Sequence, residues 1–427
     1  MTVSGSLVSS PIVSAVLTNA DQLELIRSGA NSTTLLHWSG GRVSKCREFK
    51  FGRRRFIPAA LGEALPSEIR LAAGVSDYKS AAHLFSRIVD VFESTCGLDR
   101  NNAELATFFA FATHFAECRN PVPRAIVTGI DTSEGLQFIK LLGCFCRHAI
   151  PAALYEPSGH RNMPAGCSPT FVISDPRRFT TRLQFLDATQ HCESQMVRSG
   201  RGDYGPFAAV ILARDHEFEG TVPSTFCRIN TTPQVRPSLL DAKELRKIAE
   251  AFQPQLLMYR LKNRSRVASV TFDPSSLGGD TRALACVLGS CFPDSRELQD
   301  RVVELLEPHD EERRLDHARC ESAVVLEALL ILCHEEKASA HVGEIADFAN
   351  GILEARGDGY QVEARRVGSI LRFFSLGLHR DSLGYGFVLS TEIKGRIHRL
   401  ARSFEVPFLK GHIQKCDICK KLSPHAP

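Results

Sequence analysis

Hydrophobic and polar positions repeat with a changing period along this chain, and each period predicts a kind of element. From about Asp77, apolar residues recur at helical spacing, as at Leu84, Ile88 and Phe92, and a second segment with the same spacing follows. Three short apolar runs come next, separated by helical patterns; they cover residues 124–129, 169–175 and 208–213. Parallel strands connected by helices give this succession, so we expect an α/β core between about residues 77 and 271.

The first 76 residues have a different pattern, which predicts a small N-terminal module containing β-structure. Residues 35–38 and 49–51 have the composition of strands, and Gly40 and Gly41 between them predict a turn that joins the two. We expect this module to have a thin core.

The C-terminal part predicts helices and one hairpin. After a strongly helical stretch over residues 298–336, apolar residues recur every three or four positions over 342–355, and a second helix begins at about Glu363. Gly384-Tyr385-Gly386 then lies between apolar pairs, as in the turn of a strand-turn-strand wing. Two helices and a hairpin predict a winged-helix domain, whose second helix enters the major groove of DNA and whose wing touches the backbone.

Polar residues of the second predicted helix are spaced so that they share one exposed face. On this interpretation five residues face DNA, four from the helix and one near the wing: Arg365, Arg366, Ser369, Arg372 and Arg380. The alternative is that the domain contacts a protein or packs against the α/β core, because a solvated helix face also carries arginines.

The first predicted strand of the α/β core has the context of a phosphate-binding loop. That motif is Gly, four residues, then Gly-Lys and Ser or Thr, because backbone amides and the lysine hold phosphates while the hydroxyl holds magnesium. Gly129 matches the first glycine, but Glu134, Gly135 and Leu136 take the places of the second glycine, the lysine and the hydroxyl. Residues 130–135 would form the loop. The candidate nucleotide-binding residues are Gly129, Thr132, Ser133, Gly135 and, as a magnesium ligand at the end of the second strand, Asp175.

Two interpretations of this degenerate motif remain. One is a nucleotide site of unusual chemistry that uses ATP and Mg²⁺; the other is an ATPase fold retained as a scaffold. Loss of the lysine and the hydroxyl together removes the charge partner of the phosphates and the anchor of the metal, which favours the scaffold and argues against enzymatic activity. Lys140 lies a full turn into the following helix and is simply explained as a solvated lysine.

The order of these motifs resembles that of a group of uncharacterised bacterial proteins, which is itself similar to the ATPase half of phage and plasmid primase-helicases. The resemblance covers residues 76–405 and is carried by the segments 127–142, 169–175, 253–263, 366–371 and 397–401. It implies a degenerate P-loop NTPase fold with a winged-helix tail and a link to mobile DNA or its control. Because the lysine and the hydroxyl are missing here, ATPase or helicase activity does not carry over.

Length and composition fit this organisation. The chain has 427 residues, of which 43% are hydrophobic and 23% charged, as in globular proteins of two or three domains. We expect four segments: an N-terminal module (1–76), a degenerate P-loop ATPase-like domain (77–297), a helical and winged-helix domain (298–405), and a tail (406–427). We expect a nucleic-acid-binding accessory or regulatory factor; the alternatives are an atypical DNA-dependent ATPase or helicase, and a protein-interaction scaffold.

The net charge of +4 is unevenly distributed, which matters for a polyanionic partner. Residues 42–56 hold seven Lys and Arg against one Glu, and residues 341–427 hold thirteen Lys and Arg against nine Asp and Glu. DNA is therefore the expected partner, beside a protein. The triplet 53–55, flanked by Phe49, Phe51 and Phe56, is either a second phosphate contact or the charged face of a hairpin.

Most of the fourteen cysteines lie in apolar contexts, where free cysteine packs as a small hydrophobe, so we expect them to be reduced. Cys416 and Cys419 are the exception, because they have the spacing of half a zinc site that His412 and His425 would complete. Two free thiols in a tail are the alternative. The sequence thus assigns no cofactor and leaves ATP with Mg²⁺, and Zn²⁺, as candidates.

The chain has no apolar run long enough to span a membrane, and its N-terminus lacks the basic stretch and cleavage site of a secretory signal. We therefore expect a cytoplasmic protein that does not contact membranes.

Overall fold

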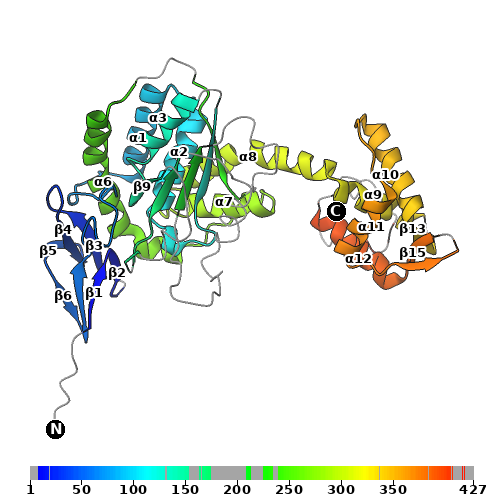
Figure 1. Cartoon of the computed structure of the whole chain (residues 1–427), viewed down its shortest axis with the longest axis horizontal. Coiled ribbons are helices and arrows are strands. Elements are labelled where there is room, and N and C mark those ends of the chain that lie inside the picture. Colours follow the sequence, from blue (N-terminus) through cyan, green and yellow to red (C-terminus); the bar gives the residue numbers. More distant parts are fainter. Residues whose placement is uncertain are drawn as a thin grey trace, which may run out of the picture. The chain divides into compact units, whose positions relative to one another are not determined.

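A computed structural model gives the fold of the chain (Figure 1). It describes residues 8–18, 20–129, 132–152, 163–164, 166–174, 208–212, 225–233, 239–335, 337–382, 384–404, 406, 416 and 418. By their internal contacts, the residues divide into two compact units, Met1–Glu307 and Pro308–Pro427. The domain boundaries expected at residues 76, 297 and 405 stay predictions.

The first unit is built around a parallel sheet of five strands in the order β12-β8-β11-β10-β9. Its strands are short, and the inner strands β10 and β11 are buried along their whole length, as parallel strands usually are. Along β8, for example, Ala125 and Val127 belong to one core and Ile126 to another. The α/β class with a parallel sheet is confirmed. The five strands are β8 (Arg124–Thr128), β9 (Ala149–Ala152), β10 (Thr170–Ile173), β11 (Ala208–Leu212) and β12 (Cys227–Asn230).

Helices cover one face of this sheet: α1 (Ala81–Cys96), α2 (Arg100–Thr113) and α3 (Thr132–Leu142). Ser80 caps α1 by accepting a hydrogen bond from the backbone NH of His83, and Gly97 ends it in the left-handed conformation. Aromatic rings pack among the helices, as where Phe108 of α2 and Phe292 meet with centroids 5.4 Å apart. Both helices predicted after residue 77 are confirmed, and both face one core.

The N-terminal strands cover the opposite face of the parallel sheet. They form two sheets, β2-β3-β4-β5 and β1-β7-β6. Leu25 and Phe56 from these strands pack in one cluster with Ile126 and Phe171 of the parallel sheet, so the expectation of a thin core is wrong. The strands are β1 (Val8–Ile12), β2 (Ser14–Val16), β3 (Asp21–Arg27), β4 (Thr33–Ser39), β5 (Arg42–Cys46), β6 (Phe49–Phe51) and β7 (Arg54–Pro58).

The turn at Gly40 and Gly41 is confirmed, but it joins β4 to β5. Positive φ angles of 52° and 91° at these glycines let the chain fold back at once, so that Trp38 pairs with Val43. The expected pairing of residues 35–38 with residues 49–51 is therefore wrong. β6 pairs instead with β7 in the other N-terminal sheet.

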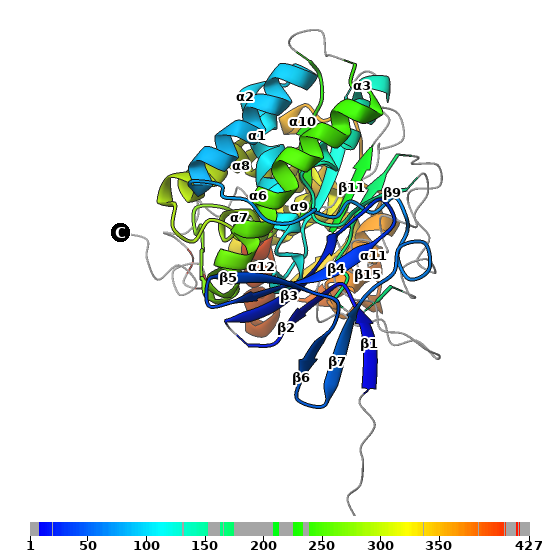
Figure 2. The ribbon, with the colours of Figure 1, turned by 90° about the vertical axis from the view of Figure 1, so that its left-hand side faces the viewer.

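A long helix, α6 (Ala242–Ser269), connects the two layers of the first unit (Figure 2). Its start is fixed by a capping box of Asp241 and Glu244. Leu256 packs into the core beneath α1 and α2, whereas Leu261 packs with Trp38 from the N-terminal strands. The 3₁₀ helix η1 (Ala116–Cys118) and the helix α7 (Gly279–Gly289) complete the unit, and α8 (Arg296–Arg319) crosses its boundary.

The second unit combines helices with a three-stranded antiparallel sheet of order β13-β15-β14. A single hydrophobic core holds them together, with Leu330, Ile345, Val367 and Ile397 among its buried members. The elements are α9 (Glu321–His334), β13 (Ser339–His341), α10 (Val342–Arg356), α11 (Ala364–Phe373), β14 (His379–Asp381), β15 (Gly384–Val388) and α12 (Thr391–Ser403).

The two helices predicted around residues 342–355 and from residue 363 are confirmed as α10 and α11, and the hairpin is confirmed as β14 and β15. Its turn is not at Gly384-Tyr385-Gly386, because these residues belong to β15. A Cβ on Gly386 would lie 2.7 Å from the carbonyl oxygen of Ala340 in β13. The pattern of the sequence had not predicted β13, and its close approach explains this glycine.

Among the described helices, none is long and apolar enough to cross a membrane. The described cysteines are free thiols. Burial raises the pKa of Cys96 and Cys167 to about 12, which keeps these thiols protonated and unreactive. Most of the described cysteines are buried or half-buried in apolar surroundings, as expected of structural residues.

Candidate nucleic-acid interface

Helix α11 separates an apolar face from a polar one. Val367, Ile370 and Leu371 are buried in the core of the second unit, while Arg365, Ser369 and Arg372 are exposed. The hydroxyl of Ser369 donates to the carbonyl oxygen of Arg365 at 3.2 Å, one turn back. Three of the five predicted DNA contacts therefore lie on the exposed side of one helix.

Arg366 is also exposed, but it has a partner within the protein. Its Nε donates to Oε2 of Glu321 at 2.5 Å, an ion pair that ties α11 to the first turn of α9. A phosphate would have to compete with this carboxylate. Of the five predicted residues, Arg366 is thus the one with a role in positioning α11.

Arg380, the fifth predicted residue, lies on the hairpin. It pairs across the sheet with Tyr385, and its guanidinium carbon lies 5.9 Å from the centre of the tyrosine ring. Both side chains are exposed. The hairpin therefore presents a cation beside an aromatic face, a combination that contacts nucleic-acid backbone and bases.

Charge divides sharply within the second unit. Residues 308–362 contain five Lys and Arg against twelve Asp and Glu, whereas residues 363–402 contain eight Lys and Arg against three Asp and Glu. The positive potential of the unit is thus associated with α11, the hairpin and α12. A count over residues 341–427 mixes the two parts and hides the contrast.

Exposed apolar side chains accompany the basic ones, and the sequence analysis missed them. Phe373, next to Arg372 at the end of α11, is 77% exposed, and Val388 at the end of β15 is 67% exposed. Monomeric proteins tolerate isolated residues of this kind, and of the two Phe373 is adjacent in sequence to a candidate contact, Arg372. The helical pattern alone could have identified Phe373, because it falls outside the buried stripe of α11.

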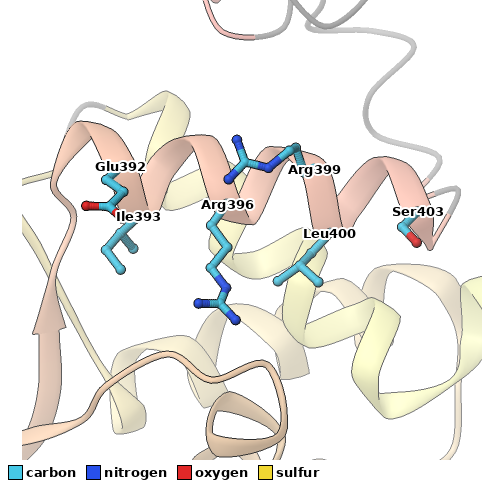
Figure 3. A pocket seen from close by; sticks show the side chains of 6 residues that line it. All are labelled: Glu392, Ile393, Arg396, Arg399, Leu400 and Ser403. Atoms are coloured by element: carbon cyan, nitrogen blue, oxygen red, sulfur yellow. The ribbon is translucent and has the colours of Figure 1, made fainter.

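Helix α12 carries further basic residues around a shallow pocket of about 430 Å³ (Figure 3). Arg396 and Leu400 project from the same side of the helix (Figure 3). Ser390 caps α12 by accepting a hydrogen bond from the backbone NH of Ile393. The described residues that line the pocket are Glu392, Ile393, Arg396, Arg399, Leu400 and Ser403.

The first unit has a basic surface of its own on β5, β6 and β7. The seven basic side chains of residues 42–56 are all exposed, and Glu48 forms an ion pair with Arg55. The strands β6 and β7 form an antiparallel hairpin that carries the basic triplet of residues 53–55. Of the flanking aromatic residues, Phe51 is 45% exposed, whereas Phe56 is buried in the core and unable to stack on a base.

The residues predicted for nucleotide binding lie where β8 leads into α3. The helix already begins at Thr132, so that only residues 129–131 separate it from β8, and the expected loop of residues 130–135 is wrong. Glu134 lies in the first turn of α3, and the side chain of Ser133 is exposed. Asp175 lies outside the described residues.

Both glycines of the degenerate motif are explained by packing. A Cβ on Gly129 would overlap Oγ1 of Thr231, and a Cβ on Gly135 would lie 2.5 Å from Cδ1 of Leu212. Ligands of open α/β sheets bind beyond the carboxyl ends of strands whose connections leave in opposite directions. Here these strands are β8 and β11, and Leu212, the last residue of β11, packs against α3 at this point.

The tail cysteine Cys416 lies beside histidines other than the predicted ones. Its Sγ is 3.3 Å from Nε2 of His398 in α12, which is in turn 3.2 Å from Nε2 of His334 in α9. Burial lowers the pKa of His398, so its imidazole is neutral at pH 7. The other predicted ligands, which are His412, Cys419 and His425, lie outside the described residues.

A buried ionic network in the first unit had no signal in the sequence. Arg260 in α6 lies 2.8 Å from Glu24 in β3 and 2.6 Å from Glu117, and Arg147 lies 3.1 Å from Glu24. Arg264 extends the network to Glu117 at 3.1 Å. Burial alone would raise the pKa of Glu24, but the guanidinium groups of Arg147 and Arg260 outweigh it and lower this pKa to about 2.

No protein-family model matches this chain, and no curated protein matches it. The A-form apo structure of the NrS-1 C-terminal region is 11% identical, with 86% of this chain and 97% of that chain covered and a TM-score of 0.35. Drosophila ORC bound to DNA is 14% identical (76% and 92% covered, TM-score 0.18), and the Aeropyrum pernix ORC1 protein in complex with DNA is 13% identical (77% and 93% covered, TM-score 0.17). Because all three TM-scores are this low, we draw no conclusion from these similarities.

Proposed function

We propose that this chain is a DNA-binding protein in which α11 and the β14–β15 hairpin form the contact surface. The observation that carries the proposal is the exposed face of α11, where Arg365, Ser369 and Arg372 stand free of the core within the basic part of the second unit. A helix of this kind fits the major groove, and its arginines neutralise phosphates or pair with guanine.

The order of elements in the second unit supports a winged-helix module. A helix, a strand, two further helices and a hairpin follow one another as α9, β13, α10, α11 and β14–β15. In such a module α11 is the recognition helix, and the hairpin, with Arg380 and Tyr385, is the wing. The ion pair of Arg366 with Glu321 holds the recognition helix against the first one.

The first unit then acts as a scaffold that does not hydrolyse nucleotides. Its degenerate motif has no lysine or hydroxyl at the phosphate positions, and its two glycines are accounted for by Thr231 and Leu212. The basic strands β5–β7 offer a second contact to phosphates. These features are consistent with an accessory or regulatory factor of DNA transactions; the relation to mobile-element replication proteins that we propose rests on the resemblance of the sequence alone.

A second function, contact with a protein, is favoured by the exposed apolar residues. Phe373 and Val388 are the kind of anchor that protein partners bury, and Phe373 directly follows Arg372 in the sequence. A protein partner would cover them without requiring Arg365 or Arg372. Replacing Phe373, and separately replacing Arg365 and Arg372, therefore distinguishes the two functions.

The test is the affinity of the purified protein for a fluorescent DNA duplex, measured by anisotropy. Arg365→Ala combined with Arg372→Ala removes two exposed charges from α11, and we expect binding to weaken roughly tenfold or more. Phe373→Ser should have a smaller effect on DNA binding. If α11 instead contacts a protein, Phe373→Ser is the substitution that should weaken this contact.

A matched control removes the same charge elsewhere. Lys243 and Lys247 are exposed on successive turns of α6, and their double replacement by Ala should leave the affinity for DNA near that of the unaltered protein. Equal losses in both double variants would indicate nonspecific attraction by net charge. Unchanged affinity in the α11 variant would exclude α11 as the recognition helix.

A further inference from the structure

Three side chains with metal-binding atoms converge in the second unit from separate parts of the chain. His334 comes from the end of α9, His398 from the middle of α12, and Cys416 from the segment after α12. Their ligand atoms all lie within 4.8 Å of one another. Such a meeting of two imidazoles and one thiol differs from the surface clusters of acidic residues that are common without a metal.

The orientation of His398 suits a ligand. Its Nδ1 lies 2.7 Å from the carbonyl oxygen of Lys394, and only a protonated Nδ1 can donate to that oxygen. The lone pair of Nε2 then points toward His334 and Cys416. A backbone carbonyl that fixes one ring nitrogen in this way is the usual support of a metal-binding histidine. The side chain is buried, so water does not compete for Nε2.

Two of the three distances among these atoms are close to those of tetrahedral zinc, and the third is within 4.8 Å. Bonds of about 2.0–2.1 Å to nitrogen and about 2.3 Å to sulfur place two nitrogen ligands about 3.3 Å apart and a nitrogen and a sulfur about 3.6 Å apart. The corresponding distances here are 3.2 Å between the Nε2 atoms of His334 and His398 and 3.3 Å between His398 and Cys416.

We propose that His334, His398 and Cys416 bind a zinc ion. The candidate for a fourth ligand is Cys419, which lies outside the described residues and is suggested by its sequence spacing alone. Cys419 follows Cys416 at the CxxC spacing with which two thiolates bind one zinc ion. Two imidazoles and a thiolate are ligands that zinc prefers, and a second thiolate from Cys419 would complete the set of four that structural sites use. His334 and His398 thus replace His412 and His425 in the ligand set that the sequence had suggested.

The site would have a structural role. It joins the segment around Cys416 to α9 and α12, two helices whose apolar faces share the core beneath α11. Zinc would therefore stiffen the base on which the proposed recognition helix lies. The inference is independent of DNA binding, since a structural site of this kind serves any function of the unit.

The experiment is elemental analysis of the full-length protein purified under reducing conditions without chelators. We expect about one zinc ion per chain, as for a structural site with four ligands. His398→Gln, Cys416→Ala and Cys419→Ala should each lower the zinc content severalfold. His412→Ala with His425→Ala, and Cys320→Ala as a cysteine control in the same unit, should retain zinc.

Cobalt provides a second, spectroscopic readout of the same site. Co²⁺ added to the metal-free protein should give the visible bands of a tetrahedral site and a thiolate charge-transfer band, and that band should fall by about half in Cys419→Ala because one of two thiolates is lost. A protein that binds neither zinc nor cobalt would hold the three side chains by hydrogen bonds alone, and the proposal would be wrong. Loss of zinc in the His412 and His425 variant, with retention in His398→Gln, would also overturn it.

Discussion

Arg260 donates a hydrogen bond from Nε to Oε1 of Glu24 at 2.8 Å, and both side chains are only 1% exposed. The pair joins the long helix α6 to strand β3, which are 236 residues apart in sequence. Such an ion pair adds little to the stability of a protein compared with an apolar pair of the same size. Removing one partner is nevertheless costly, because the other charge stays buried without compensation. The pair therefore links the N-terminal strands to α6 within the first unit.

We expect Glu24→Gln to lower the free energy of unfolding by about 3–5 kcal/mol, because Arg147 and Arg260 would remain buried with one carboxylate fewer. Urea denaturation of both proteins measures this difference. Glu48→Gln is the matched control, since Glu48 pairs with Arg55 at the surface and its loss should cost less than about 1 kcal/mol. Similar midpoints for the two variants would contradict the importance of the network.

The same region predicts a dependence of stability on pH. Burial lowers the pKa of His114 from 6.5 to about 3 and the pKa of His148 well below 6.5. The positive charge of nearby Arg147 acts in the same direction, because it disfavours the charged form of both histidines. At a pH between the lowered pKa of each folded histidine and the unfolded value of about 6.5, the unfolded chain binds protons that the folded chain does not. The stability of the fold should therefore decrease as the pH drops below about 6.5. Glu24 adds a loss below about 4.5, because its folded pKa is lowered to about 2.

Thermal denaturation between about pH 8 and pH 4 tests this, and His148→Asn gives a sharp comparison. His148 has a φ of 46°, and asparagine tolerates this left-handed conformation while carrying no titratable group. The variant should therefore lose less stability between pH 7 and pH 5 than the unaltered protein, by about 1 kcal/mol or more. Parallel pH profiles would mean that His148 does not titrate in this range on unfolding.

Much of the fold could be predicted from local sequence patterns, because the spacing of apolar residues and the turn residues determine helices, strands and turns within a few positions. The strands at residues 124–129, 169–175 and 208–213, the helices α10 and α11, and the parallel connections were all predicted. The features that were predicted wrongly or missed depend on contacts between segments far apart in the sequence. The pairing of β6 with β7, the strand β13 and the contact of Glu24 with Arg260 are set by partners that no local period encodes.

A substitution in the degenerate motif tests whether Gly135 is required for packing or for binding phosphate. Gly135→Ala should destabilise the protein by about 1–3 kcal/mol, because the new methyl group would meet Leu212 in a close-packed core. Leu212→Val in the same chain should recover part of that loss by removing the colliding atom. A double-mutant cycle from denaturation measures the coupling, which should be near zero if the glycine instead serves a bound nucleotide.

Nucleotide itself should have little effect. Leu136 and Gly135 stand where the motif requires a hydroxyl and a lysine, so we expect neither turnover of ATP nor a shift in melting temperature at millimolar ATP with Mg²⁺. Both measurements should be made with and without DNA. Turnover that disappears in Asp175→Ala would contradict the scaffold interpretation and make Asp175 a metal ligand.

The candidate sites show the same division between local and distant information. Exposure of Arg365, Ser369 and Arg372 was predictable, since helical spacing alone separates them from Val367 and Ile370. The partner of Arg366 was not, because Glu321 lies 45 residues earlier. For Cys416 the sequence suggested nearby histidines, whereas folding brings His334 and His398 to it.

The salt dependence of DNA binding tests the central claim most directly. For the full-length protein, the logarithm of the binding constant should fall linearly with the logarithm of the salt concentration between about 50 and 200 mM, because phosphate contacts release counterions. Removing Arg365 and Arg372 together should make this slope shallower by about two, roughly one for each lost phosphate contact. A slope identical to that of the unaltered protein would show that α11 does not contact the DNA backbone.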